Sequence, residues 1–378
     1  MQQELGGNFA TTIGYVGSQG RNLFLRSVAN QITQVVTNPN PASAAFVIRE
    51  FSIVNRDAAG NITSVQNPYA EVDFKTSGGH DEYNALMLSL NRRSSRGIAM
   101  NMQYTFANSR GTSGGSNEAN TAANNAKTLE QFEYEQGYNN FDVRHTFNLS
   151  LLYSIPYGNG RKYGSNASAA MNALLGGWDV GGIVNARSGV PINVLVTRPD
   201  ILYRDTASGL YYTGPAAGRE AVINTPGGGA SRNVRRPDLV SGVDPFIEDG
   251  GLIFLNPAAF ATPLPGTFGN MERNSVHGPN FHQTDFFFSK EFSSGGRSSV
   301  QFRMEVFNLF DSVNFANPGG TLNAAIPATV GQANTLQPGQ AYTTAAAGPT
   351  FGRLTSTVGR TVGLGTPRQI QFALRFQF

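Results

Sequence analysis

Residues 97–107, GIAMNMQYTFA, carry the pattern that decides the fold of this chain. Every second position is apolar, and small or polar residues separate the apolar ones, which are Ile98, Met100, Met102, Tyr104 and Phe106. Successive side chains of a β-strand point to opposite faces, so the segment predicts a strand with one apolar and one polar face. Its length is close to the roughly 9–11 residues that a tilted strand needs to cross a bilayer.

The same alternation recurs along the chain. It is clear at 141–155, 299–306 and 368–378, and weaker at 8–16, 83–91, 178–188 and 281–292. Together these segments predict about eight strands, and the long apolar run of a membrane-spanning helix does not occur. The sequence therefore predicts an all-β fold.

The predicted connections fall into two classes. Residues 92–96 and 293–297 are tight turns and 156–176 is intermediate, whereas four connections are long: 17–82, 108–140, 189–280 and 311–367. Short turns at one end of the strands and long loops at the other are typical of an antiparallel transmembrane β-barrel, whose turns are periplasmic and whose loops are extracellular. The long segments are rich in Gly, Asn, Ser, Thr, Ala and Pro, and we interpret them as solvated loops without a domain of their own.

Composition agrees with this class of protein. The chain has 44 Gly among 378 residues, only 14% charged residues and no cysteine. Its net charge of +3 comes from 28 basic and 25 acidic residues that are scattered along the sequence, so a nucleic-acid partner is not indicated. The first residues, MQQELGGNFATTIGYVG, lack the basic start and apolar stretch of a secretory signal. An exported protein is therefore expected to have a signal peptide encoded further upstream.

The last eight residues, QFALRFQF, resemble the β-signal that the outer-membrane assembly machinery recognises. The resemblance rests on a polar residue, a small residue where Gly is commoner, and two terminal aromatic residues: Gln371, Ala373, Phe376 and Phe378. Further segments resemble the barrel of TonB-dependent receptors of the Oar-like, carboxypeptidase-regulatory-like group: TIGYVGSQGRNL, EYNALMLSLNRR, NMQYTFANS, FDVRHTFNLSLLYSIPYG, GWDVGGIVNARSGVPINV, NPAAFATP and VQFRMEVFNLFDSVNF. These segments extend over nearly the whole chain.

The resemblance implies that residues 1–378 are the C-terminal part of a barrel of roughly 22 strands. It also implies a plug domain, a TonB box and a signal peptide that lie outside this sequence. The implied partners are outer-membrane lipid, that plug, the TonB complex and the assembly machinery. The implied activity is energy-coupled uptake of a scarce ligand, whose class stays open among siderophores, cobalamin, oligosaccharides and peptides.

Charged residues on the polar faces of the strands are expected to line the lumen, because charge facing lipid at mid-membrane costs about 2–4 kcal/mol. By parity these are Asp142, Arg144, Asp179, Arg187, Arg303, Glu305 and Arg375. They would contact plug or ligand, or else form a lattice of ion pairs that fills the lumen. The alternation of side chains along a strand leaves both interpretations open.

Catalysis and metal binding find little support in the sequence. The four histidines are at 80, 145, 277 and 282, and His80 stands beside two carboxylates in GGHDE without a second histidine at ligand spacing. No serine motif is accompanied by the ordered carboxylate and histidine of a catalytic triad. We therefore expect no enzyme, cofactor or metal. Loop aromatics that could stack on a sugar or peptide ligand are Phe132, Tyr134, Tyr138, Tyr203, Tyr211 and Tyr212.

Two other classes of protein share parts of this pattern. A complete small barrel with a structural or adhesive role would end in the same assembly signal, but loops this long and the missing signal peptide argue against it. A soluble carbohydrate-active enzyme would need a rigid cleft with paired carboxylates, which the pattern does not supply.

Overall fold

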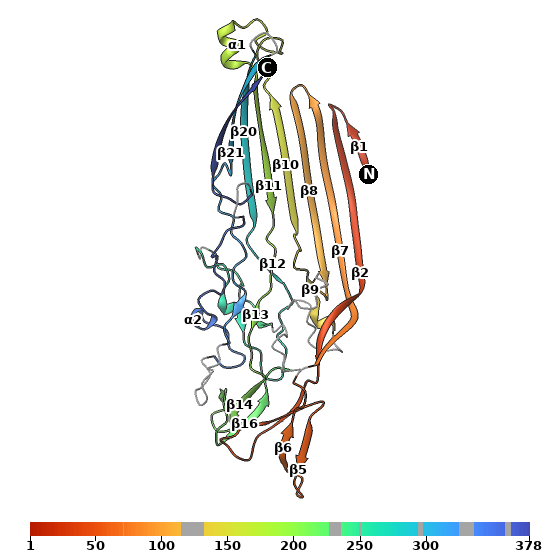
Figure 1. Ribbon diagram of the computed structural model, residues 1–378, viewed down its shortest axis with the longest axis vertical. Coiled ribbons are helices and arrows are strands. Elements are labelled where there is room, and N and C mark those ends of the chain that lie inside the picture. Colours follow the sequence, from red (N-terminus) through yellow and green to blue (C-terminus); the bar gives the residue numbers. More distant parts are fainter. Residues whose placement is uncertain are drawn as a thin grey trace.

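In the computed structural model, each of the eight predicted segments lies at least partly within a strand of one large sheet (Figure 1). The structure describes residues 1–70, 72–114, 132–226, 236–248, 251–293, 298–324, 336–359 and 364–378. The strands follow each other in chain order, and every neighbouring pair is antiparallel. They are β1 (Gln2–Leu5), β2 (Phe9–Ala29), β7 (Val72–Ser95), β8 (Ile98–Gly111), β10 (His145–Ser154), β11 (Trp178–Arg187), β20 (Phe281–Ser293), β21 (Ser299–Phe307) and β23 (Gln369–Gln377).

The all-β fold with mostly antiparallel strands is thus confirmed. Two features of the sheet were not predicted, namely the short strand β1 and the two-residue strand β9 (Gly137–Tyr138), which pairs with β8. Within the described residues the sheet is open, because β1 pairs with β2 and β23 pairs with β21, but β1 and β23 do not pair with each other.

Strands β2 and β7 are much longer than the sequence predicted. They span 21 and 24 residues, so residues 17–29 and 72–82 are strand and the prediction of a loop over 17–82 was wrong there. At about 3.3 Å per residue, β7 is roughly 80 Å long, well beyond the ~30 Å hydrocarbon core of a bilayer. The pairing shifts register between Gly20 and Phe24, where Asn22 has φ 55°, so the outer part of this hairpin twists away from the sheet.

The opposite end of the sheet carries the short connections. Ser95 pairs with Ile98, and the two residues between them, Arg96 and Gly97, have φ of 52° and 82°. Two successive positive φ angles are the requirement of the tight hairpin turn that matches strand twist. The predicted turn at 293–297 lies outside the described residues except for Ser293. The intermediate connection contains α1 (Ala169–Leu175), and no helix among the described residues is long and apolar enough to span a membrane.

The long connections meet at the other end of the sheet (Figure 1). We call the described residues within 30–71, 112–144, 188–280 and 308–368 the cap. It contains two helical turns, η2 (Phe132–Glu135) and η3 (Pro257–Ala259), the short helix α2 (Thr344–Ala347), and strands β3 (Ile32–Val36), β4 (Phe46–Arg49), β5 (Ile53–Arg56), β6 (Ile62–Gln66), β12 (Pro191–Ile192), β13 (Leu195–Val196), β14 (Ile201–Asp205), β15 (Tyr211–Tyr212), β16 (Arg219–Ile223), β17 (Asp238–Leu239), β18 (Phe260–Ala261), β19 (Val276–His277) and β22 (Thr321–Leu322).

The cap has a hydrophobic core, which corrects the interpretation of these segments as solvated loops. The segment 189–280 contributes Leu255, Phe260 and Met271, and the segment 311–367 contributes Leu322 and Phe351, all nearly inaccessible to solvent. The rings of Phe260 and Phe351 pack edge to face at 5.5 Å. Each loop alone has few apolar residues, but the two loops together supply enough of them to form one core.

Candidate functional site

The outer face of the sheet is apolar. Residues that stand opposite each other in the register share a face, and the row Leu88, Tyr104, Phe147 continues the alternation read from the sequence. The same face on the last strands carries Phe302, Met304, Phe372 and Phe376. Such a face suits contact with hydrocarbon.

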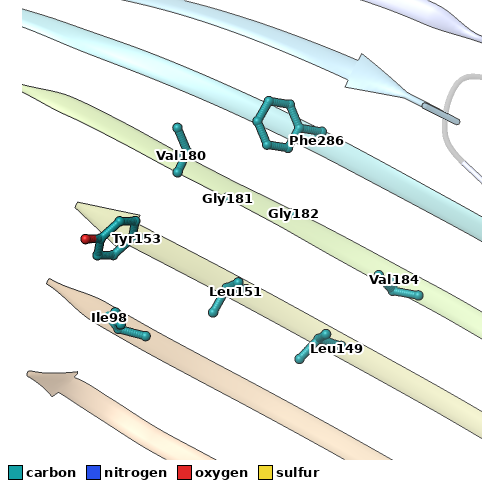
Figure 2. A pocket seen from close by; sticks show the side chains of 9 residues that line it. All are labelled: Ile98, Leu149, Leu151, Tyr153, Val180, Gly181, Gly182, Val184 and Phe286. Carbon is teal, nitrogen blue, oxygen red and sulfur yellow. The ribbon is translucent and has the colours of Figure 1, made fainter. Parts of the chain in front are cut away.

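One groove interrupts this outer face (Figure 2). It has a volume of about 430 Å³ and lies where Gly182 has no side chain between Leu151 and Phe286. The rest of its lining consists of Ile98, Leu149, Tyr153, Val180, Gly181 and Val184. The lining is almost wholly apolar, so the groove is part of the apolar outer face.

The inner face is polar and carries five of the seven predicted wall residues. The register places Asp179 opposite Ser154, Arg187 opposite Thr146, and Arg375 opposite Gln301. Arg303 and Glu305 stand on the same face of β21, opposite Ala373 and Gln371. Small residues are interspersed on this wall: Ala99, Ser150, Gly181 and Ala373.

Two of these wall residues neutralise each other. The Arg303 guanidinium donates to Glu305 Oε1 at 2.7 Å from Nη2 and 2.9 Å from Nε. It also lies 4.3 Å from the ring centroid of Phe287. Arg303 and Glu305 thus match the ion-pair interpretation of the wall.

Apolar side chains also stand on the inner face. Val16, Met87, Leu152 and Ile183 lie among the polar positions, and each is 40–47% exposed. Exposure of large apolar side chains to water is unfavourable. This wall is therefore better suited to contact with protein than to lining an open aqueous channel.

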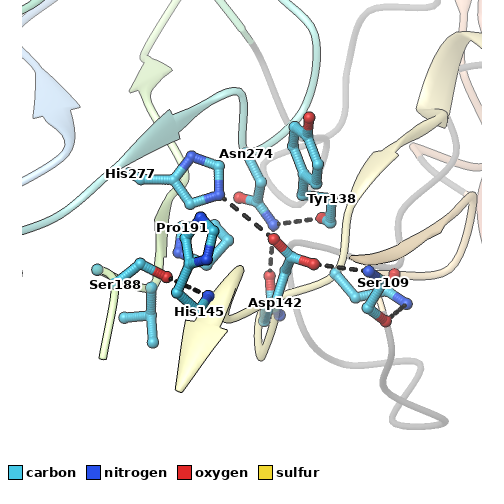
Figure 3. A network of polar contacts seen from close by, with 12 residues as sticks. Ser109, Tyr138, Asp142, His145, Ser188, Pro191, Asn274 and His277 are labelled. Atoms are coloured by element: carbon cyan, nitrogen blue, oxygen red, sulfur yellow. Dashed lines mark hydrogen bonds and ion pairs between the residues drawn. The ribbon is translucent and has the colours of Figure 1, made fainter. Parts of the chain in front are cut away.

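Asp142 and Arg144 are not on the strand wall, which corrects their predicted position. Strand β10 begins at His145 rather than at residue 141, and Asp142 is a buried residue of the cap (Figure 3). Its Oδ1 accepts from the Ser109 backbone N–H at 2.6 Å, and its Oδ2 lies 3.5 Å from His277 Nε2. The Arg144 guanidinium lies 5.5 Å from the ring centroid of Tyr138. These two residues join the end of the sheet to the cap.

The loop aromatics serve largely to hold the cap together. The Tyr134 hydroxyl donates to the Gly269 carbonyl, and burial raises the pKa of Tyr134. The Tyr203 hydroxyl accepts from the Ala45 N–H at 3.0 Å, Tyr138 packs against His277, and Tyr212 lies under Arg219. Tyr211 is half-buried and its N–H donates to Gln337 Oε1 at 2.9 Å, while Phe132 is half-buried in η2.

Three buried arginines that the sequence did not single out join the loops. Arg236 Nη1 donates to Glu135 Oε2 at 2.8 Å, with both side chains 1% exposed. Arg273 donates to the carbonyls of Gly111 and Thr112, and burial lowers its pKa to about 10. Arg198 donates to carbonyls that include Asn224 and Thr267. No sequence pattern marks these residues, because their partners lie far away along the chain.

The predicted assembly signal lies on β23, which is an edge strand of the large sheet in the part of the chain that the structure describes. Gln371 and Ala373 face inward, Phe376 faces outward opposite Val300, and Phe378 follows the strand fully exposed. Within the described residues no group of three or more His, Asp or Glu side chains comes close enough to hold a metal ion.

Comparison with known proteins gives the family. A model described as outer membrane beta barrel domain matches residues 1–371. The chain belongs to this outer membrane beta-barrel family. Its apolar outer face is therefore the surface that meets the lipid of the outer membrane.

Among solved structures, this outer membrane beta-barrel chain is similar to the outer membrane transporter YddB from Escherichia coli. The two have 9% sequence identity and a TM-score of 0.32, and the match covers 82% of this chain and 28% of that one. The chain thus spans less than a third of the length of this neighbour. No curated protein matches.

Proposed function

We propose that this chain forms the barrel wall and the ligand-capturing extracellular surface of a TonB-dependent receptor. In this proposal the sheet is completed by further strands, a plug fills the lumen, and TonB moves the plug from the periplasm. The transported ligand is a scarce small molecule, sugar or peptide, and no covalent chemistry takes place.

The inner face is the observation that carries the proposal. It combines small side chains, charged side chains and the exposed apolar residues Val16, Met87, Leu152 and Ile183. A water-filled pore favours a uniformly polar wall. A folded plug, by contrast, would cover the apolar residues and pack closely against the small ones.

The cap supports ligand capture. Its loops are held in place by a hydrophobic core and by buried arginines. A surface fixed in this way loses less conformational entropy when a ligand binds than a set of mobile loops would.

The coding sequence upstream of Met1 is the first test, and we expect it to encode a signal peptide, a TonB box and a plug. A photo-cross-linking amino acid in that TonB box should then give an adduct with TonB in living cells. The same cross-linker at Leu210, an exposed residue of the cap, should give none, because the cap is expected on the far side of the membrane.

Absence of an upstream plug, or absence of the adduct, would contradict the proposal. Such a result would favour the rival function, a structural or adhesive outer-membrane barrel without transport activity.

A further inference from the structure

A cluster of polar residues lies on the inner face where β10, β11 and β20 meet the cap. The register sets Thr146, Arg187 and Phe281 in one row, and Asn148, Asn185 and Gln283 in the next. A cavity of about 190 Å³ is lined by five of these residues, all but Gln283, together with Ala186 of β11 and with Val358 and Leu364 of the cap.

The side chain of Gln283 already has hydrogen-bond partners, one of which belongs to the cap. Its Oε1 accepts from the Gly365 N–H at 2.6 Å, and its Nε2 donates to Asp285 Oδ1 at 2.8 Å. Asp285 in turn accepts from the Asn308 N–H at 2.8 Å. These bonds fix the cap segment that closes one side of the cavity.

The neighbouring polar side chains have no such partners. Among the described residues, Asn148, Asn185 and Arg187 make no side-chain hydrogen bond or ion pair. The only contact found for the Arg187 guanidinium there is with the ring of Phe281, whose centroid is 5.5 Å away. The contrast with Arg303 is direct, because that arginine on the same wall is neutralised by Glu305.

We propose that this cluster is a subsite for a carboxylate. The planar guanidinium of Arg187 matches the two oxygens of a carboxylate, and the two Asn amides can bond to hydroxyl groups beside it. Phe281 would contact the apolar side of the bound group. The cavity is smaller than the roughly 300–1,000 Å³ of a complete ligand pocket, so it holds one end of a ligand.

This inference rests on the proposed function, and it deepens it by naming an acidic ligand. The carboxylate has two sources, an incoming ligand or an acidic side chain of the same protein outside this chain. Both are bound by the same chemistry, and the two arms of the test tell them apart.

The test uses the full-length protein in detergent and saturation-transfer NMR titrations with D-glucuronate and D-glucose, which differ in one carboxylate. Wild-type protein should bind glucuronate at least about tenfold more tightly, the usual effect of a charge-assisted hydrogen bond. Arg187→Ala should abolish the difference and Arg187→Lys should keep part of it. Arg161→Ala, in the turn at the other end of the sheet, is the matched control and should behave as wild type.

The second arm compares the unfolding temperatures of wild type and Arg187→Ala without sugar. If the protein supplies the carboxylate, the variant unfolds several degrees lower and wild type does not distinguish the sugars, which still supports the subsite. Equal sugar binding together with equal unfolding temperatures overturns it. Neither arm involves TonB, so a missing TonB adduct would refute the proposed function and leave this result standing.

Discussion

Gly181 shows how a single position on the inner wall limits substitution. A Cβ there would lie 2.5 Å from the Phe287 ring and 2.6 Å from the Leu151 carbonyl oxygen, whereas a Cβ at Gly14 on the same face would meet nothing within 4 Å. We expect Gly181→Ala to destabilise the folded barrel by about 1–3 kcal/mol through overpacking, and Gly14→Ala to be tolerated. The temperature at which the barrel loses its heat-modifiable gel mobility measures both, and equal temperatures would refute the close packing of Phe287 on Gly181.

A second prediction at the scale of single residues concerns the buried ion pair of Glu135 and Arg236 in the cap. Removing one partner leaves a buried charge without its counter-charge, which costs about 3–5 kcal/mol. Arg236→Met should therefore loosen the cap, seen as faster protease cleavage on intact cells. The double variant Arg236→Met with Glu135→Leu should recover much of the protection, because no unpaired charge remains. Equal cleavage of the single and double variants would show that the ion pair has no such role.

At the scale of elements, the period-two pattern predicted where strands lie but not how far they extend. Residues 17–29 and 72–82 pair as strand without regular apolar alternation. Outside the hydrocarbon no lipid selects one apolar face, so a strand there need not alternate. The start of β10 at His145 was not predicted either, because the Asp142 side chain accepts from the Ser109 backbone N–H and the residues before His145 do not join the strand.

Strand β21 should tolerate charge on one face only. Phe302 and Met304 face lipid by register, so Phe302→Arg or Met304→Arg should block folding into the membrane, at a cost of about 2–4 kcal/mol each. Gln301→Arg, on the inner face, is the control and should fold. Heat-modifiable gel mobility of the full-length protein reports folding, and equal effects on both faces would refute the assignment of faces.

Strand β23 should direct assembly through its end. Deletion of Phe378 from the full-length protein should lower its amount in the outer membrane while synthesis is unchanged, because the exposed terminal ring belongs to the proposed recognition strand. Surface labelling against total protein measures the ratio. An unchanged ratio would count against the β-signal.

At the scale of the whole molecule, the alternation of side chains along the strands predicts the residues of the inner wall, but it does not predict the folded cap. Five wall residues lie where the alternation put them, since a period of two needs only local sequence. The core of the cap joins residues as far apart as Ile192 and Phe351, and buried arginines bridge loops more than 100 positions apart, as Arg236 does to Glu135. Such contacts leave no local pattern, which is why the sequence alone predicts solvated loops.

The open sheet leads to a last prediction about residues 1–378 expressed alone. Strands β1 and β23 each leave one edge without a partner among the described residues, and hydrocarbon does not tolerate unpaired backbone groups. Closure on itself would give a narrow ring whose interior must be filled by side chains, but the inner face has small residues such as Ala99, Ser150 and Gly181. The isolated chain should therefore aggregate in water or stay dependent on detergent. Refolding into lipid vesicles, followed by protease protection and strand content, tests this expectation, and a compact, protease-resistant monomeric barrel would contradict it.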